Sequence, residues 1–231
     1  MGEPLFDLAD EYEAMLMRGV SLSGEHWSFF AKARVEELRR RLPATVAPRR
    51  ILDFGCGIGY TTDLLAAAFP AAEVVGIDTS ADALRRAEAT HGSPRVRFAP
   101  VEGFSEAGRF DLCYTNGVFH HIEPGRRAGA LALIRGALSD AGYFALFENN
   151  PWNPGTRMVM RRIPFDRDAQ TLSPREAGRF LRAEGWRVAA CRSMFYFPRP
   201  LAILRAAEPW LGRWPLGAQY YVLAQPLARP D

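Results

Sequence analysis

Three glycines, at positions 55, 57 and 59, crowd the stretch ILDFGCGIGY directly after an apolar run. Glycine at such a turn permits positive φ and leaves no Cβ between the backbone and a ligand. A helix that follows the turn offers free N–H groups and the positive end of its dipole. Nineteen residues beyond Gly59, Asp78 ends the next apolar run, where a carboxylate can accept both hydroxyls of a ribose. These residues predict a site for an adenosine-like group.

The spacing of the glycines separates the candidate nucleotides. A dinucleotide site has the pattern G-x-G-x-x-G, but Tyr60 takes the place of the last glycine here. A phosphate-binding loop needs Gly-Lys followed by Ser or Thr, and this stretch lacks it. The pattern therefore disfavours a nicotinamide-dependent dehydrogenase, and it leaves a purely structural turn as the alternative to a ligand site.

Apolar runs of strand length alternate with helical patterns along most of the chain. The predicted strands are RRILDFG, EVVGID, RVRFAP, FDLCYTN, GYFALFEN, WRVAACRSMF and QYYVLAQ. The predicted helices are YTTDLLAAAF, SADALRRAEAT, PGRRAGALALIRGAL and SPREAGRFLRAEG, with Ser80 and Ser173 as N-caps. This alternation is typical of an α/β fold with a seven-stranded, doubly wound, mostly parallel sheet. The last run has no clear helix before it, so we expect an antiparallel last strand.

Four blocks of the sequence resemble the class I S-adenosylmethionine-dependent methyltransferases of small molecules. DFGCGIGY and the following GIDTS look like that family's first motif and its successor. FDLCYTNGVFHHI is similar to the fourth-strand motif, and LSDAGYFALFENN to the fifth-strand motif. The resemblance covers roughly residues 48–225. It implies a Rossmann-like fold, S-adenosylmethionine as the cofactor, and methyl transfer as the activity.

The resemblance also implies which residues hold the cofactor. Asp53 and the glycine loop would wrap its methionine part, Asp78 would hold the ribose hydroxyls, and Thr79 would border the adenine. VRFAPVEGFSE departs from the family's commoner Gly-Asp pattern, and Glu102 with Gly103 is its best match to the acidic residue that faces the adenine amine. The implied cofactor residues are Asp53, Gly55, Cys56, Gly57, Gly59, Asp78, Thr79, Glu102, Gly103 and Asn116.

His120 and His121 follow the fourth predicted strand. A histidine there has an ordinary pKa near 6.5 and could act as a general base at the rim of the sheet. The alternative is a packing role, in which one ring orients the loop. The three cysteines lie far apart, and no Cys/His spacing is typical of zinc, so we expect neither a metal nor a disulfide.

Three segments should border the acceptor of the methyl group. Residues 1–47 are predicted to form an N-terminal helical lid on a Rossmann-like domain at 48–231, with cap insertions at about 149–172 and 198–217. Trp210 and Trp214 of the second insertion would cap an apolar pocket, with a dimer interface or a membrane surface as alternatives. The candidate substrate residues are Trp27, Phe30, Arg34, Glu148, Asn149, Trp152 and Arg157.

The composition limits the class of protein. With 231 residues, 48% of them hydrophobic, the chain can form one domain with a full core. The net charge of +3 comes from scattered arginines, so we expect no nucleic-acid partner. The acidic N-terminus lacks the apolar run of a signal peptide, and no apolar run is long enough to cross a membrane. We expect a cytoplasmic monomer or homodimer.

Together these patterns predict a methyltransferase that acts on an O or N nucleophile. Its acceptor would be a small, partly apolar or aromatic and possibly acidic molecule, such as a natural-product or peptide intermediate. An Asn/Asp-Pro-Pro-Tyr motif, typical of nucleobase amine methylation, is missing after the fourth strand. The alternative function is that of a cofactor-binding homologue that serves as a partner protein without methyl transfer.

Overall fold

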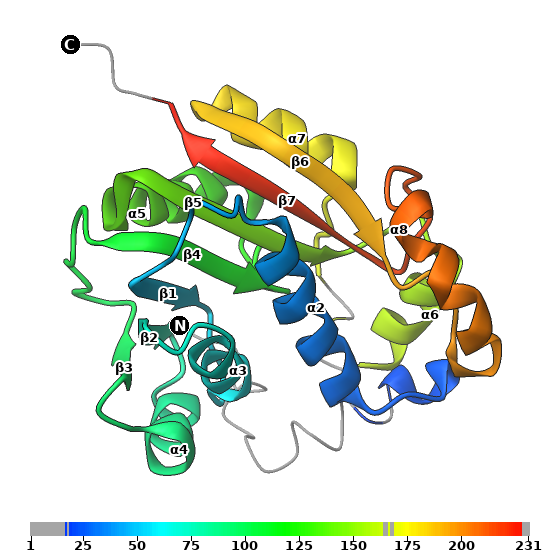
Figure 1. Cartoon of the computed structure of the whole chain (residues 1–231), viewed down its shortest axis with the longest axis horizontal. Coiled ribbons are helices and arrows are strands. Elements are labelled where there is room, and N and C mark those ends of the chain that lie inside the picture. Colours follow the sequence, from blue (N-terminus) through cyan, green and yellow to red (C-terminus); the bar gives the residue numbers. More distant parts are fainter. Residues whose placement is uncertain (1–16, 18, 164–165, 167–168, 228–231) are drawn as a thin grey trace.

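The computed structural model describes residues 17, 19–163, 166 and 169–227 of the chain. Within them, seven strands form one sheet in the order β3-β2-β1-β4-β5-β7-β6 (Figure 1). The strands are β1 (Arg50–Phe54), β2 (Glu73–Asp78), β3 (Val96–Pro100), β4 (Phe110–Asn116), β5 (Leu138–Asn149), β6 (Trp186–Met194) and β7 (Gln219–Pro226). Only β7 runs against its neighbours, β5 and β6. The predicted mostly parallel sheet with an antiparallel last strand is confirmed.

Helices cover both faces of this sheet (Figure 1). The α-helices are α2 (Trp27–Arg41), α3 (Tyr60–Ala68), α4 (Ala81–His91), α5 (Arg127–Ala137), α6 (Pro154–Arg162), α7 (Pro174–Ala183) and α8 (Glu208–Leu211), and the 3-10 helices are η2 (Ser21–Ser23), η3 (Pro124–Arg126) and η5 (Arg199–Ala207). Adjacent residues of a strand point to opposite faces. Accordingly, Ile51 packs in one buried cluster with α2 and α3, and Leu52 packs in the other with α5 and α7. The predicted doubly wound arrangement is confirmed.

Serine caps begin two of the helices as predicted. The Oγ of Ser80 accepts a hydrogen bond from the N–H of Ala83 at the start of α4. At α7, the Oγ of Ser173 accepts from the N–H of Glu176, while the Glu176 carboxylate accepts from the N–H of Ser173. This reciprocal pair satisfies two backbone donors that a helix otherwise leaves without partners.

The predicted start of β5 is wrong. The sequence pattern predicts the strand from Gly142, but β5 begins at Leu138. Leu138 pairs with Phe110 of β4, and a shift in register follows before Tyr143 pairs with Leu112. This irregularity interrupts the alternation of polar and apolar residues, so the early part of the strand does not look like one in the sequence.

The segment at 198–217 forms short helices, as expected, but its large side chains do not cap a pocket. Ile203 is 88% exposed and Trp210 78% exposed, on the outer side of η5 and α8. The hydroxyl of Tyr196 lies within hydrogen-bond distance of the backbone carbonyls of Leu211 and Trp214 and can donate its one proton to either. The prediction that these apolar side chains line the pocket is therefore wrong.

The structure describes part of the predicted lid. Residues 1–16 and 18 lie outside the described residues, and α2 forms most of the remainder. His26 begins α2, because its Nδ1 accepts a hydrogen bond from the N–H of Ser28. α2 packs beside α3, above the strand ends of the sheet (Figure 1). No helix in the described part of the chain is long and apolar enough to cross a membrane.

The cap of α7 gives a test of this local structure. We expect Ser173→Ala to lower the free energy of unfolding by about 1 kcal/mol, because the N–H of Glu176 loses its acceptor. Urea unfolding followed by circular dichroism measures the change. Ser105→Ala is the control, since Ser105 is exposed on a loop, and we expect a change below about 0.5 kcal/mol. Equal effects of the two variants would contradict the assigned cap.

Candidate functional site

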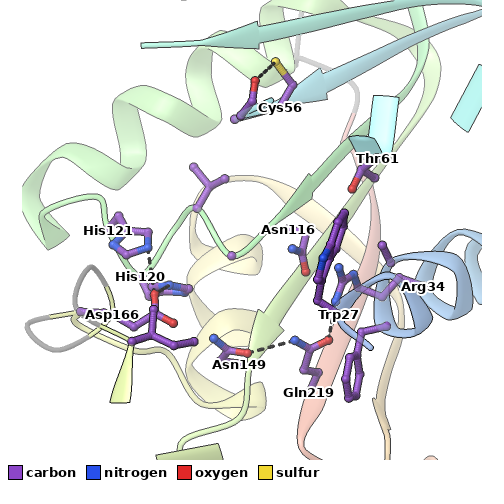
Figure 2. Close-up of a pocket in the computed structure, with 18 of the residues that line it drawn as sticks. Trp27, Arg34, Cys56, Thr61, Asn116, His120, His121, Asn149, Asp166 and Gln219 are labelled. Carbon is purple, nitrogen blue, oxygen red and sulfur yellow. Dashed lines mark hydrogen bonds and ion pairs between the residues drawn. The ribbon is translucent and has the colours of Figure 1, made fainter. Parts of the chain in front are cut away.

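A cavity of about 1350 Å³ opens at the carboxyl edge of the sheet. Its wall is built from the ends of β1, β2, β4 and β5 and from α2, which lies across them. The two ends of the cavity differ in chemistry, because acidic side chains gather at the glycine loop and a buried arginine lies near β5 and β7. Figure 2 shows the wall from the Cys56 loop to Gln219.

The three glycines of the loop are needed for different reasons. Gly55 has φ +75°, and a Cβ there would lie 2.3 Å from the Cγ2 of Val118. Gly57 has φ +54° and faces open space in the cavity wall. Gly59, with φ +82°, is the N-cap of α3 and packs against Phe98, so it does not line the cavity. Only the first two glycines therefore let a ligand approach the backbone.

Asp78 is fixed in the cavity wall by backbone donors. Its Oδ2 accepts from the N–H of Gly57 at 2.7 Å, and its Oδ1 accepts from the N–H of Ser80 at 2.9 Å. The acidic residue thus holds the glycine loop against the start of α4. Each carboxylate oxygen has a second lone pair, so the side chain can still accept hydrogen bonds from a ligand.

Asp53 lies deeper, at the end of β1. Burial raises its pKa to about 7, while the hydrogen bond from the Thr62 hydroxyl, at 2.7 Å, opposes the rise. Burial also raises the pKa of the Cys56 thiol well above its usual value, and the nearby Asp53 and Asp78 raise it further. A thiol that keeps its proton is a poor nucleophile, so Cys56 contributes backbone and shape to the loop.

The remaining residues predicted to hold the cofactor divide into two groups. Thr79, Glu102 and Asn116 line the cavity. Gly103 does not line it; it has φ +77° and no atom within 4 Å of the position of a Cβ. A turn after β3 explains this glycine, which corrects the prediction for Gly103.

The structure is at odds with a base role for His120. The ring is 2% exposed, and its Nδ1 lies 2.5 Å from Glu148 Oε2, while its Nε2 lies 3.3 Å from Asp166 Oδ1. Burial opposes a charge on the ring, but Glu148 and Asp166 outweigh it and raise the pKa of His120 to about 10. Because both ring nitrogens are engaged and the proton is held, His120 is corrected to a residue that supports the loop.

His121 reaches the same carboxylate from the cavity wall. Its Nε2 lies 3.2 Å from Asp166 Oδ1, and its ring centroid is 4.2 Å from that of His120. Asp166 is buried, yet hydrogen bonds from the two histidines outweigh burial and lower its pKa. Both histidines and Asp166 line the cavity, on the side away from the glycine loop.

The predicted substrate residues are only partly brought together. Trp27, Phe30, Arg34 and Asn149 line the cavity. Glu148 is 1% exposed and points into the core, where it accepts from the N–H of Phe119 and contacts His120. Trp152 packs instead under Arg175, and Arg157 lies on the outer face of α6. These three predictions are corrected: Glu148 faces the core, and Trp152 and Arg157 face away from the cavity, although Thr156 and Val159 of α6 line it.

Arg34 is a buried cation at the β5–β7 side of the cavity. It is 7% exposed, and its Nη1 donates to Gln219 Oε1 at 2.9 Å, while Gln219 donates to Asn149 Oδ1 (Figure 2). In the described part of the chain, no carboxylate pairs with Arg34 and no acceptor bonds its Nε. A buried charge of this kind is unfavourable unless a counter-ion meets it, so the site is suited to an anion.

Comparison with known proteins identifies the family of this fold. Residues 52–144 match a family model described as a methyltransferase domain. The chain is 30% identical to a trans-aconitate 2-methyltransferase of Rhodopseudomonas palustris over 62% of its length, and 36% identical to one of Methylobacterium radiotolerans over 55%. It also resembles the structure of an S-adenosylmethionine-dependent methyltransferase from Mesorhizobium loti (TM-score 0.61, 19% identity, 82% of this chain and 96% of that one).

By these matches, residues 52–144 resemble a methyltransferase domain, and the described fold is that of S-adenosylmethionine-dependent methyltransferases. The chain spans about half the length of the curated relatives it matches, 56% and 48% of the two named. The predicted family, and S-adenosylmethionine as the cofactor of that family, are confirmed.

Several residues that line the cavity were not predicted from the sequence. Gln219 begins β7, Asp166 lies between α6 and α7, and Phe195 and Phe197 follow β6. The aromatic run FYF at 195–197 is a visible signal, since three aromatic residues at a strand end favour a pocket wall. No feature of the neighbouring sequence indicates that Gln219 or Asp166 lines the cavity, because the residues they contact are distant along the chain.

The contacts of the buried Glu148 carboxylate lead to a prediction about the stability of the chain. We expect Glu148→Gln to lower the free energy of unfolding by about 3 kcal/mol, because it removes a buried charge that faces the His120 ring. Thermal and urea unfolding measure the loss. The control is Asp140→Asn on the exposed part of β5, with an expected change below about 0.5 kcal/mol. A loss at position 148 as small as that of the control would show that the buried pair carries no charge.

Proposed function

We propose that the chain transfers the methyl group of S-adenosylmethionine to an oxygen of a small, partly apolar molecule that carries a carboxylate. The observation that carries this proposal is the division of one cavity into an acidic end at the glycine loop and an end with the buried cation of Arg34, which has no carboxylate partner among the described residues. The first end suits an adenosine and a sulfonium, and the second suits an acid. The chain would then be an enzyme that acts on carboxylic acids of natural-product or central metabolism.

At the acidic end, the proposed contacts follow the geometry of the loop. Asp78 would accept the ribose hydroxyls, and Glu102 would face the adenine amine beside Thr79. The methionine part would run along Gly55 and Gly57 toward Asn116, with Asp53 beneath it. The sulfonium is already a strong electrophile, so the protein's task is to align the acceptor with the methyl carbon and exclude water.

The cavity is large enough to hold two ligands at once. Sites for one drug-sized molecule usually measure about 300–1000 Å³, and this cavity of about 1350 Å³ is larger. Aromatic side chains, including Trp27, Phe30 and Phe195, line the part beyond Asn116. An acceptor with an apolar body and a charged end would fill this part, with its carboxylate against Arg34 and Gln219.

A carboxylate acceptor also fits the side chains around it. A carboxylate is ionised at neutral pH and needs no general base, and His120 has both nitrogens engaged. The two relatives reported above are named for trans-aconitate, which is an acid. An acceptor that needs no base, and the acid for which these relatives are named, both favour oxygen over nitrogen as the methylated atom.

We further propose that residues 1–47 act as a lid over the site. Trp27 packs edge-on against Tyr60, with ring centroids 4.4 Å apart, and thereby joins α2 to the end of the glycine loop. The ring of Phe30 packs against that of Phe195, with ring centroids 4.9 Å apart, which joins α2 to the segment after β6. These aromatic contacts span the cavity, and they would seal the acceptor from water once both ligands are bound.

The direct test is a methyl-transfer assay. The protein is incubated with S-adenosylmethionine and a panel of small carboxylic acids that starts with trans-aconitate, and the demethylated cofactor is quantified. We expect turnover with at least one acid and none with its amide. If cofactor binds but no acid is methylated, the proposed acceptor is wrong; if no cofactor binds, the proposed site is wrong.

For the cofactor end, we expect Asp78→Ala to weaken binding of S-adenosylhomocysteine at least about a hundredfold. Two hydrogen bonds to a charged group are lost, each contributing about 1.5–3 kcal/mol. Calorimetric titration measures the dissociation constant. Asp82→Ala is the matched control, because Asp82 is an exposed carboxylate on α4 that pairs with Arg85. An Asp78 variant that binds as tightly as the control would refute the ribose contact.

For the acceptor end, we expect Arg34→Gln to raise the KM of the acid at least about tenfold, since a charge-assisted hydrogen bond is lost. The dissociation constant of S-adenosylhomocysteine should change less than about threefold. Arg40→Gln is the control, because Arg40 lies exposed on the same helix. The opposite pattern, with weakened cofactor and unchanged KM, would assign Arg34 to the carboxylate of the cofactor's methionine part.

A further inference from the structure

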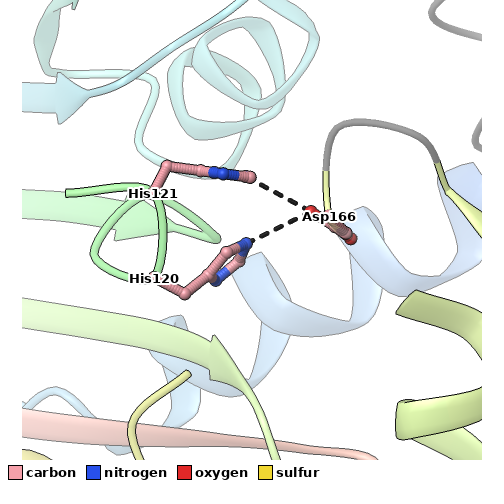
Figure 3. Close-up of side chains that lie close together, drawn as sticks. All are labelled: His120, His121 and Asp166. Atoms are coloured by element: carbon pink, nitrogen blue, oxygen red, sulfur yellow. Dashed lines mark hydrogen bonds and ion pairs between the residues drawn. The ribbon is translucent and has the colours of Figure 1, made fainter. Parts of the chain in front are cut away.

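Two imidazoles and one carboxylate converge on the cavity wall at the end of β4. The Nε2 atoms of His120 and His121 lie 3.3 and 3.2 Å from the same Oδ1 of Asp166. One donor atom from each of the three residues lies within 4.8 Å of the others. Figure 3 shows both rings directing a nitrogen toward the Asp166 carboxylate.

We propose that these three residues form a binding site for one divalent transition-metal ion such as Zn²⁺. The ligands would be the Nε2 atoms of His120 and His121 and the Oδ1 of Asp166. Two histidines and one carboxylate, with a further position for water or substrate, make up a known type of open zinc site. Imidazole also suits the neighbouring transition metals, so the donor set favours these over Mg²⁺ or Ca²⁺.

The distances between the donors match this coordination. Zinc binds histidine nitrogen and carboxylate oxygen at about 2.0–2.2 Å, so two ligands of a tetrahedral ion lie about 3.3 Å apart. The two measured nitrogen–oxygen distances are 3.3 and 3.2 Å. Two of the three distances between ligand atoms therefore fit a bound ion, and all three ligand atoms lie within 4.8 Å of one another.

A second carboxylate supports the site from behind. The Nδ1 of His120 contacts Glu148 at 2.5 Å, and Glu148 is itself fixed by the N–H of Phe119. Such a carboxylate behind a ligating histidine orients the ring and strengthens its basicity toward a metal. The metal would take the place that the Nε2 proton of His120 occupies beside Asp166.

The charges around the site favour a cation. Glu148 and Asp166 are both buried, and within the described residues their only ion-pair partners are the two imidazoles. The guanidinium of Arg127 is nearby, but its hydrogen bonds go to the backbone carbonyls of Phe119, Ile122 and Gln170. Two buried carboxylates that form no ion pair with a described arginine or lysine would be well matched by a divalent ion.

The open side of the site faces the cavity. All three ligand residues line it, and His121 is the most accessible of them. A metal bound there could coordinate an oxygen of the acceptor and hold it for methyl transfer. This consequence rests on the proposed function, whereas metal binding itself does not, so the two can fail separately.

The test is a titration of untagged, chelator-treated protein with Co²⁺, followed by displacement with Zn²⁺, both without cofactor. We expect one Co²⁺ per chain with visible absorption bands, and loss of the bands when Zn²⁺ is added. Asp166→Asn and His121→Gln should each raise the dissociation constant of Zn²⁺ at least about a hundredfold. His91→Gln should not change it, because His91 belongs to another His–Asp pair, 3.9 Å from Asp63.

Folding is checked independently of the metal. Circular dichroism and binding of S-adenosylhomocysteine report whether each variant keeps its fold, and His121→Gln changes the more exposed of the two rings. Less than about 0.2 ion per chain in the parent protein would overturn the proposal. Equal affinity in the parent and in folded His121→Gln and Asp166→Asn would overturn it as well, since the metal would then bind elsewhere.

Discussion

The buried carboxylate of Glu148 is the interaction on which the acceptor side of the site depends. It lies at the end of β5 and bonds both the backbone of the β4 loop and the ring of His120. Those two bonds fix how the loop leaves β4, and they direct the other nitrogen of His120 toward Asp166. In a parallel sheet, the ends of neighbouring strands bring polar groups together at one edge, and buried groups there need hydrogen-bond partners. One carboxylate thus orients the ring of His120, whose other nitrogen meets the Asp166 carboxylate.

The fold could be predicted from the sequence because its signals are local. Apolar runs, glycine turns and the caps at Ser80 and Ser173 lie within a few residues of the structure they determine. The glycine loop was predictable for the same reason, although its roles are uneven and only Gly55 and Gly57 border the cavity. The start of β5 was missed because its register shift depends on pairing with β4.

The acceptor side was less predictable, because its contacts join distant parts of the chain. The sequence led us to expect Glu148 and Trp152 in the cavity. In the structure, Glu148 points into the core and Trp152 packs against Arg175. Asp166 meets His120 across 46 residues, and Arg34 meets Gln219 across 185. No spacing rule covers such distances. The absence of a zinc spacing in the sequence therefore says little about a site assembled from one adjacent pair and a remote carboxylate.

In the proposed complex, one cavity holds a cofactor and an acidic acceptor side by side. A calorimetric titration of trans-aconitate and related acids into protein saturated with S-adenosylhomocysteine tests this arrangement. We expect an acid to bind with one molecule per chain while S-adenosylhomocysteine stays bound. Displacement of S-adenosylhomocysteine by the acid, seen as a rise in its apparent dissociation constant with acid concentration, would show instead that the two ligands compete for one position.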